Sequence, residues 1–400
     1  MDAHRLAASA APRHATWPPV VVSVAVLFLF SPETGLAQGV GDNQWFVRTG
    51  ATSGFILPAN PYMTSVSDAR DPIRWGQDLT VEIGRQTDGG SEWHQLYGIP
   101  SYGFGFSVAS FRNDVKHARP IEAYTFFSWP FLRLSDRLDL TTDFGMGMSW
   151  HWKEVDDTTE SLETTLGSDL NARIDWGFYL RYASTPRIAI FTGIDYTHRS
   201  NGGMVQPDRG INVIGPKVAV QYSLARTPSP PLVVDRPPFH PTWEFIVGGA
   251  GGVKNVIERA DPLTRGDFWT LDTTAAAQRQ FYRFGKIAAG TDVTYDGSLG
   301  ARIDGANTMW RADAGQRWAV GLYGGYEHIV GRFGAIVQVE EYVFRGFAAS
   351  DSTRLYQRFG WRYHMSDRCW STVAIRAIEG RKANALEFGV GYRMPLFEQH

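Results

Sequence analysis

Residues 138–150 read LDLTTDFGMGMSW, and this stretch decides the fold class of the chain. Its even positions are mostly apolar and finish at Met146, Met148 and Trp150, whereas its odd positions carry Asp, Thr, Gly and Ser. Alternation with a period of two is typical of a strand with one apolar face and one polar face. The stretch therefore predicts a long, half-buried β-strand.

The same alternation recurs at residues 170–182, 287–296 and 386–394. A soluble β-sandwich would also alternate in this way. However, strands of about 9–13 residues have the length that a tilted strand needs to cross a bilayer. Their apolar faces also tend to finish in Trp, Tyr or Phe, as girdles at a membrane boundary do. We therefore expect an all-β fold, a transmembrane antiparallel up-and-down β-barrel.

The composition of the 400 residues excludes several other classes. The chain has 14 Trp, 16 Tyr and 24 Phe, which is too many aromatic residues for a disordered protein. A single cysteine, Cys369, excludes a disulfide framework, and a net charge of −2 argues against nucleic acid as a partner. A mean hydropathy of −0.24 is too low for a bundle of membrane helices.

The first segment, residues 1–37, has the pattern of a cleaved signal peptide. Arg5 and Arg13 precede an apolar run at residues 20–30, which is too short to span a membrane as a helix. The small residues that end at Ala37 suit cleavage before Gln38. Export of a β-barrel predicts the outer membrane of a Gram-negative cell.

The remaining chain contains two groups of candidate strands. Eight precede residue 225, within residues 38–224, and six to eight more follow in residues 242–400. A Pro-rich connection at residues 225–241 separates them. We expect one barrel of about 14–16 strands, with two barrels as the alternative. The candidate strands lie at residues 45–57, 73–86, 102–112, 122–134, 138–151, 168–182, 186–201, 210–224, 242–254, 268–283, 286–298, 316–331, 333–346, 354–365, 369–380 and 384–394.

One strand pair breaks the pattern of an apolar outward face. The even residues from Ile188 to Tyr196 are mostly apolar, but His198 and Ser200 continue the same row. Asn212 begins the outward row of the next strand. Because neighbouring strands are antiparallel, these three polar residues are expected to meet at one rim on the lipid-facing side. Polar groups on a lipid-facing surface are costly in free energy, so their presence there indicates a function.

Nucleophilic catalysis would be such a function. A serine hydroxyl needs a base to remove its proton, and a third group must hold the histidine in the correct tautomer. The backbone N–H of Gly202, in an Asn-Gly-Gly turn after the serine, is placed to stabilise an oxyanion. An ordinary pair of strand-end residues is the simpler interpretation of an isolated His-x-Ser. Asn212 and the Asn-Gly-Gly turn favour the catalytic one.

The motif His198-Arg199-Ser200-Asn201-Gly202, followed by Gln206-Pro207 and Gly210-Ile211, resembles that of the outer-membrane lipid A 3-O-deacylases of the acyloxyacyl hydrolase group. The resemblance implies a barrel with a lipid-facing Ser-His-acid triad that cleaves an ester-linked acyl chain from lipid A. It makes Ser200 the nucleophile, His198 the general base and position 212 the orienting residue. Asn201, Gly202 and Asp208 become the oxyanion or supporting residues.

Two departures from that pattern are visible. This chain has Asn212 where the short deacylases have Glu, and Asp208 where they have Asn. Residues 242–400 have no counterpart in the short deacylases, although longer relatives exist.

The stretch from Tyr196 to Gly202, with Asn212, also resembles outer-membrane phospholipase A, which uses Ser, His and Asn together with calcium. We expect a serine esterase of lipid A, with outer-membrane phospholipase A or a non-enzymatic porin-like barrel as alternatives. No cofactor or metal is expected, except calcium if the chain is phospholipase-like. The expected partners are lipid A or phospholipid and the outer membrane, with no nucleic acid; the oligomeric state stays open.

Overall fold

The computed structural model describes most of the chain after residue 43. The described residues are 44–57, 74–111, 119–152, 166, 168–205, 208, 210–225, 238–257, 265–300, 302–303, 309–310, 312–346, 354–378 and 382–396. The expected signal peptide, residues 1–37, and most of the Pro-rich connection lie outside these residues. Among the described residues, no helix is long and apolar enough to cross a membrane.

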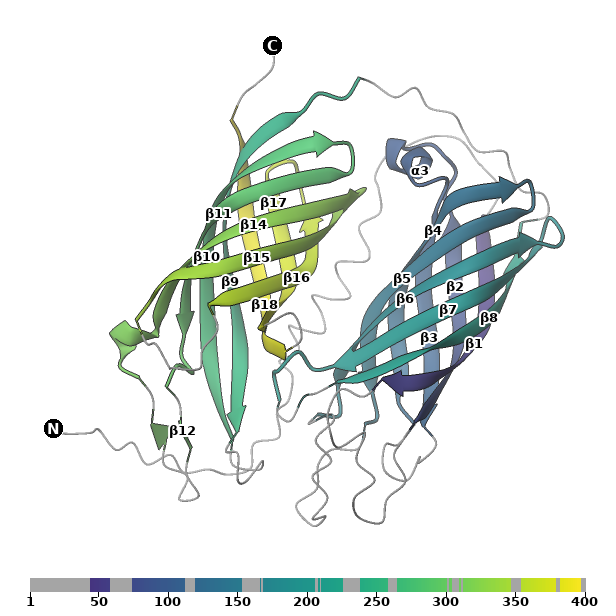
Figure 1. Cartoon of the computed structure of the whole chain (residues 1–400). Helices are drawn as coiled ribbons and strands as arrows, with labels where there is room; N and C mark the ends of the chain where they lie inside the picture. The colour runs from purple at the N-terminus through teal and green to yellow at the C-terminus, as the bar shows by residue number, and fades with distance from the viewer. Residues whose placement is uncertain are drawn as a thin grey trace, which may run out of the picture. The chain divides into compact units, whose positions relative to one another are not determined.

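The first eight strands form one closed antiparallel barrel (Figure 1). Each strand pairs with the next, and β8 returns to β1, where Val47 lies opposite Tyr222. A helix of five residues, α3 (Glu92–Leu96), lies in the connection from β2 to β3. The strands are β1 (Trp45–Leu57), β2 (Trp75–Gln86), β3 (Ser101–Phe111), β4 (Ile121–Ser135), β5 (Leu138–Trp150), β6 (Asn171–Ala183), β7 (Ile188–Ser200) and β8 (Ile211–Ser223).

Eight further strands form a second closed antiparallel barrel. It closes between β18 and β9, where Val390 lies opposite Gly249. The connection from β11 to β14 contains a two-stranded pair, β12 (Arg302–Ile303) and β13 (Met309–Trp310), and the 3-10 turn η1 (Ala314–Arg317). The barrel strands are β9 (Thr242–Ile257), β10 (Arg265–Tyr282), β11 (Gly285–Asp296), β14 (Trp318–Val330), β15 (Phe333–Arg345), β16 (Leu355–His364), β17 (Cys369–Ile378) and β18 (Lys382–Pro395).

The antiparallel β-barrel fold is confirmed, but the expectation of a single barrel is corrected. The sixteen barrel strands close as two sheets of eight, which was the alternative. The reason lies in β1, whose two edges are both paired, one with β2 and the other with β8. No edge remains for β9. Eight strands are enough for closure because side chains alone can fill a barrel of that size.

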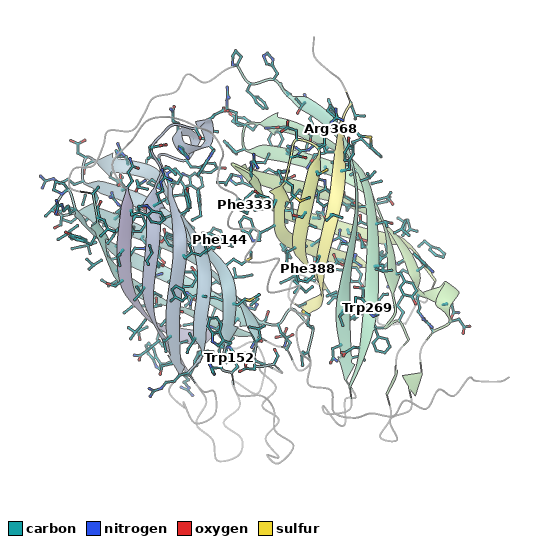
Figure 2. All side chains as sticks on the ribbon, turned by 180° about the vertical axis from the view of Figure 1, so that it is seen from behind. Phe144, Trp152, Trp269, Phe333, Arg368 and Phe388 are labelled. Carbon is teal, nitrogen blue, oxygen red and sulfur yellow. The ribbon has the colours of Figure 1, made fainter. Side chains whose placement is uncertain are left out.

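The period of two places apolar side chains outward and charged ones inward, as the sequence predicts. Leu79 and Trp269 are 67% and 69% exposed on the outer walls, and Figure 2 shows Trp269 on the second barrel. Inside the first barrel, Arg173 binds Glu122 and Asp175. Inside the second, Arg358 binds Asp292 and Glu387. Each interior is therefore occupied by paired charges.

The two ends of the first barrel differ in the length of their connections. At one end, residues 136–137 and 184–187 form short turns, and residues 87–100, which contain α3, form one longer connection. At the other end, the connections between strands include residues 58–74, 151–170 and 201–210. In outer-membrane barrels the short turns face the periplasm and the long connections face outward. The C-terminal end of β7 therefore lies at the end that corresponds to the outer leaflet.

Candidate active site

Adjacent strands bring the three predicted residues together at the long-connection end of the first barrel. His198 and Ser200 lie on the same face of β7, and His198 is the direct register partner of Asn212 on β8. The alternate residues Thr197 and Arg199 point inward and are buried, and Ser200, although it continues the outward row, is itself only 6% exposed. His198, Ser200 and Asn212 therefore share the outer wall of the barrel.

The three side chains form a continuous chain of hydrogen bonds. The Ser200 hydroxyl lies 3.0 Å from His198 Nε2. His198 Nδ1 lies 2.6 Å from Asn212 Oδ1. Because an amide oxygen only accepts, Nδ1 carries the proton and Nε2 is left with the lone pair that faces the serine. This is the tautomer that a general base requires.

Arg199 holds the end of β7 from inside the barrel. Its guanidinium, which is fully buried, donates to Glu122 Oε1 at 2.6 Å and to Asp78 Oδ1 at 2.6 Å. Glu122 also pairs with Arg173. Because Arg199 stands between His198 and Ser200, these ion pairs fix the backbone that carries both side chains.

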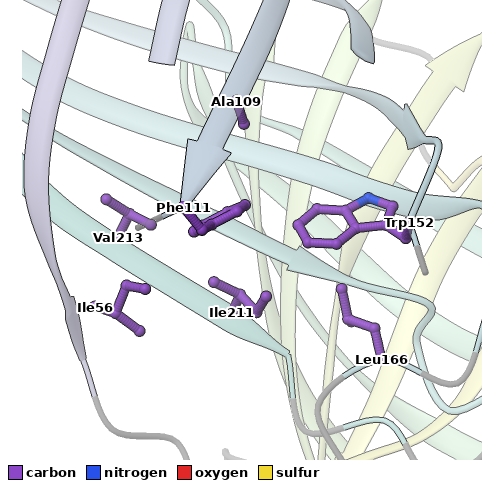
Figure 3. Packing of buried hydrophobic residues seen from close by; sticks show 7 residues of the cluster. All are labelled: Ile56, Ala109, Phe111, Trp152, Leu166, Ile211 and Val213. Carbon is purple, nitrogen blue, oxygen red and sulfur yellow. The ribbon is translucent and has the colours of Figure 1, made fainter. Parts of the chain in front are cut away.

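Apolar packing holds the start of β8 in the same way. Ile211 and Val213, on either side of Asn212, point into a buried cluster inside the barrel (Figure 3). Burial of such side chains stabilises the strand by about 1.5–3 kcal/mol each. The orienting residue is thus anchored through its two neighbours. The cluster consists of Ile56, Ala109, Phe111, Trp152, Leu166, Ile211 and Val213.

The turn after the serine contains the predicted supporting residues. The backbone N–H of Asn201 donates to Asp208 Oδ1 at 3.3 Å, so this N–H has a partner within the turn. The Asn201 side chain, which is buried, donates to Ser168 Oγ at 3.2 Å. Gly202 follows with a φ of +69°, a conformation that glycine adopts without strain. Asn201 and Asp208 therefore shape the turn, and Gly202 reverses the chain.

Gly210 makes room for the histidine. Its φ is +69°, and a Cβ atom placed there would stand 2.8 Å from Cε1 of the His198 ring. Any larger residue at this position would therefore push the imidazole away from Asn212. The sequence motif contained Gly210 only as part of a resemblance, and its contact with the ring supplies the physical reason.

Tyr196 is a site residue that the sequence interpretation missed. The alternation identified it as the aromatic end of an apolar row, and the phospholipase resemblance included it without a role, but its hydroxyl donates to Asn212 Oδ1 at 2.8 Å. Tyr196 lies two residues before His198 on the same face, diagonal to Asn212 across the strand pair. That diagonal spacing was the available signal, because long side chains reach such a neighbour.

No metal-binding group of three or more His, Cys, Asp or Glu residues is present in the part of the chain that the structure describes. The hydrogen-bonded chain from Ser200 to Asn212 is built from side chains alone. It supplies a hydroxyl, a base and an orienting acceptor. These are the groups that acyl transfer through a serine requires.

Two family models match the chain, one on each barrel. Residues 79–221 match the model described as lipid A 3-O-deacylase (PagL), and this range includes His198, Ser200 and Asn212. Residues 242–396 match the model of the acyloxyacyl hydrolase C-terminal domain. The chain belongs to the lipid A 3-O-deacylase/acyloxyacyl hydrolase family. It is an outer-membrane β-barrel protein, as expected for a Gram-negative cell.

Solved structures of outer-membrane proteins resemble the chain at low sequence identity. The crystal structure of the outer-membrane enzyme PagL shares 18% identity, covers 44% of this chain and 98% of its own, and gives a TM-score of 0.28. A porin from Rh. blastica and an outer-membrane channel from Pseudomonas putida F1 share 9% and 10% identity. The match to the porin covers 88% of this chain and 99% of the porin, with a TM-score of 0.17. The match to the channel covers 92% of this chain and 100% of the channel, with a TM-score of 0.19. No curated protein matches the sequence.

Proposed function

We propose that the chain is a serine esterase that removes an ester-linked acyl chain from lipid A through an acyl-enzyme. The observation that carries this proposal is the hydrogen-bonded chain Ser200–His198–Asn212 on the outer wall of the first barrel. A polar triad on a lipid-facing surface costs free energy, so its presence there favours a functional role. The match of residues 79–221 to the lipid A 3-O-deacylase model supports the choice of substrate.

The depth of the serine agrees with an ester substrate. Twelve residue steps separate Ile188 from Ser200 along β7. At about 3.3 Å per residue and a tilt of about 40–45°, these steps rise roughly 28–30 Å. That height equals the thickness of the hydrocarbon layer. Ser200 would then lie at the outer boundary of the layer, where acyl chains join the lipid headgroup.

The reaction would proceed in two steps. In the first, Ser200 Oγ attacks the ester carbonyl carbon while His198 Nε2 accepts the hydroxyl proton. The intermediate collapses, and the alcohol oxygen of the lipid leaves with the proton from His198. In the second step, water loses a proton to His198 and attacks the acyl-enzyme; the bond from the acyl carbon to Ser200 Oγ then breaks, His198 returns the proton to Oγ, and the fatty acid leaves.

Oxyanion stabilisation is assigned to the turn after the nucleophile. The N–H of Asn201 already donates to Asp208, so the N–H of Gly202 is the better candidate donor. Asn212 would hold His198 in its reactive tautomer without introducing a charge into the membrane. A neutral amide can serve this role, as in Cys-His-Asn enzymes.

Mass spectrometry of lipid A from cells that express the protein tests the proposal. Wild type should convert lipid A to a species that lacks one acyl chain, and Ser200→Ala should leave lipid A intact. Thr192→Val, on the same face of β7 but deeper in the wall, is the matched control and should behave as wild type. Unchanged lipid A in cells that contain folded wild type would contradict the proposed substrate.

A second candidate function is phospholipid hydrolysis, which Asn212 favours because that residue matches the outer-membrane phospholipase A pattern. Release of lysophospholipid that depends on calcium would support it. The porin-like alternative receives less support. Arg48, Arg173 and Arg199, all fully buried with acidic partners, fill the interior of the first barrel where a channel would run.

A further inference from the structure

The Asn212 side chain creates an orientation problem that a glutamate would not have. A carboxylate presents an oxygen in either orientation, whereas an amide presents oxygen on one side and NH₂ on the other. If the amide turned over, its NH₂ would face His198 Nδ1. The imidazole would then have to carry its proton on Nε2, and that proton would face Ser200. Such a histidine cannot accept the serine proton.

The hydroxyl of Tyr196 opposes this reversal. Asn212 Oδ1 accepts two hydrogen bonds, one from Tyr196 Oη at 2.8 Å and one from His198 Nδ1 at 2.6 Å. In the reversed amide the hydroxyl could only accept from the NH₂, and its own hydrogen would lose this acceptor. On a wall that faces lipid, no bulk water replaces a lost acceptor, so the reversed state is disfavoured.

We propose that Tyr196 is a positioning residue that sets the amide orientation of Asn212 and, through it, the tautomer of His198. This inference rests on the proposed function of the same site. The hydroxyl of Tyr196 bonds to Asn212, so Tyr196 acts on the base through Asn212. The requirement for the tyrosine hydroxyl is therefore specific to an asparagine at position 212.

A double-mutant cycle in the full-length protein tests the proposal. Tyr196→Phe removes one oxygen and should lower kcat about 10- to 30-fold while KM changes less than about twofold, because the base is lost and not the lipid-binding surface. In the Asn212→Glu background, the same change should lower kcat less than about threefold. Tyr182→Phe, an outward tyrosine at the opposite end of β6, is the matched control and should match wild type. An equal loss in both backgrounds, or no loss in either, would overturn the proposal.

A readout independent of turnover separates this inference from the proposed function. Side-chain ¹⁵N shifts of histidine-labelled protein report the tautomer, and the His198 signals are assigned by their loss in His198→Gln. Tyr196→Phe should shift His198 from the Nδ1-protonated form toward the Nε2-protonated form. If the tautomer shifts but lipid A is not cleaved by wild type, the proposed function fails and the positioning role stands. If the tautomer is unchanged, the positioning role fails.

Discussion

The two barrels share one architecture but differ in what they present to the lipid. Each has eight antiparallel strands, an apolar outer wall and an interior of paired charges. In the first barrel, the outward face of the seventh strand, β7, finishes at His198 and Ser200. In the second barrel, the seventh strand is β17, and the register places Val373 and Ile375 on its outward face opposite Phe388 and Leu386. The same fold therefore carries a polar triad in one barrel and apolar side chains in the other.

This difference separates the determinants of the fold from those of the site. Closure and stability need only the alternation of outward apolar and inward polar residues, which both barrels have. The proposed chemistry needs polar residues at three outward positions, His198, Ser200 and Asn212, where the alternation would otherwise place apolar ones. Function on such a fold depends on the local site and not on the architecture. Variants matched between the two barrels can test this division.

The largest expected effect is the loss of the nucleophile or the base. Ser200→Ala or His198→Ala should lower deacylation by about 10³-fold or more, because triad members act as a unit. Ser371→Ala, in β17 of the second barrel, should leave the rate unchanged. Lipid A turnover by purified protein measures both, and heat-modifiable electrophoretic mobility verifies that the barrels fold. A comparable loss in Ser371→Ala would end the assignment of catalysis to the first barrel.

The next effect concerns the glycine against the histidine ring. Gly210→Ala should lower turnover about 100-fold, because the added Cβ meets His198 Cε1 at 2.8 Å and the backbone φ is positive. The matched change in the second barrel is Gly324→Ala, where a Cβ would have no atom within 4 Å. That variant should keep full activity. Normal turnover in Gly210→Ala would show that the imidazole is not held in the described position.

A third prediction compares the buried arginines of the two interiors. Arg199→Met and Arg358→Met each leave buried carboxylates without their positive partner. Each substitution should therefore lower the free energy of unfolding by about 3–5 kcal/mol. Unfolding by urea in lipid vesicles measures the loss. Under conditions where both variants remain folded, only Arg199→Met should reduce turnover, by about tenfold. The reason is that the Arg199 side chain anchors β7 between His198 and Ser200. Equal turnover in the two variants would contradict the anchoring role.

The smallest effect is expected from metal removal. Lipid A turnover should change less than about twofold when a calcium chelator is added, because the proposed mechanism uses side chains alone. Turnover that disappears with the chelator and returns with calcium would instead favour the phospholipase-like alternative. Lysophospholipid release, measured in the same samples, distinguishes the two substrates.

The strands and the three polar exceptions could be predicted because both are local patterns. The alternation at residues 138–150 identifies a strand without knowledge of its neighbours. The positions of His198 and Ser200, two residues apart, place them on one face of any strand. Antiparallel neighbours then bring Asn212 opposite His198. Each step uses only short-range geometry.

Closure and the interior pairs could not be predicted in the same way. The pairing of β8 with β1 joins segments more than 150 residues apart, and no local pattern specifies it. Arg199 pairs with Asp78 of β2 and Glu122 of β4. These two carboxylates meet Arg199 only after the barrel has closed. Tyr196 was missed for a different reason: its apolar ring fitted the outward row, so the role of its hydroxyl was hidden.

The most direct test of catalysis by the first barrel is to identify which serine is activated. The full-length protein, folded in detergent, is treated with a fluorophosphonate, digested and analysed by peptide mass spectrometry. An adduct is expected on Ser200 in wild type, with none on the serines of the second barrel and none on Ser200 in His198→Gln. An unmodified Ser200 in folded wild type, or an equal yield of adduct in His198→Gln, would contradict catalysis by the first barrel.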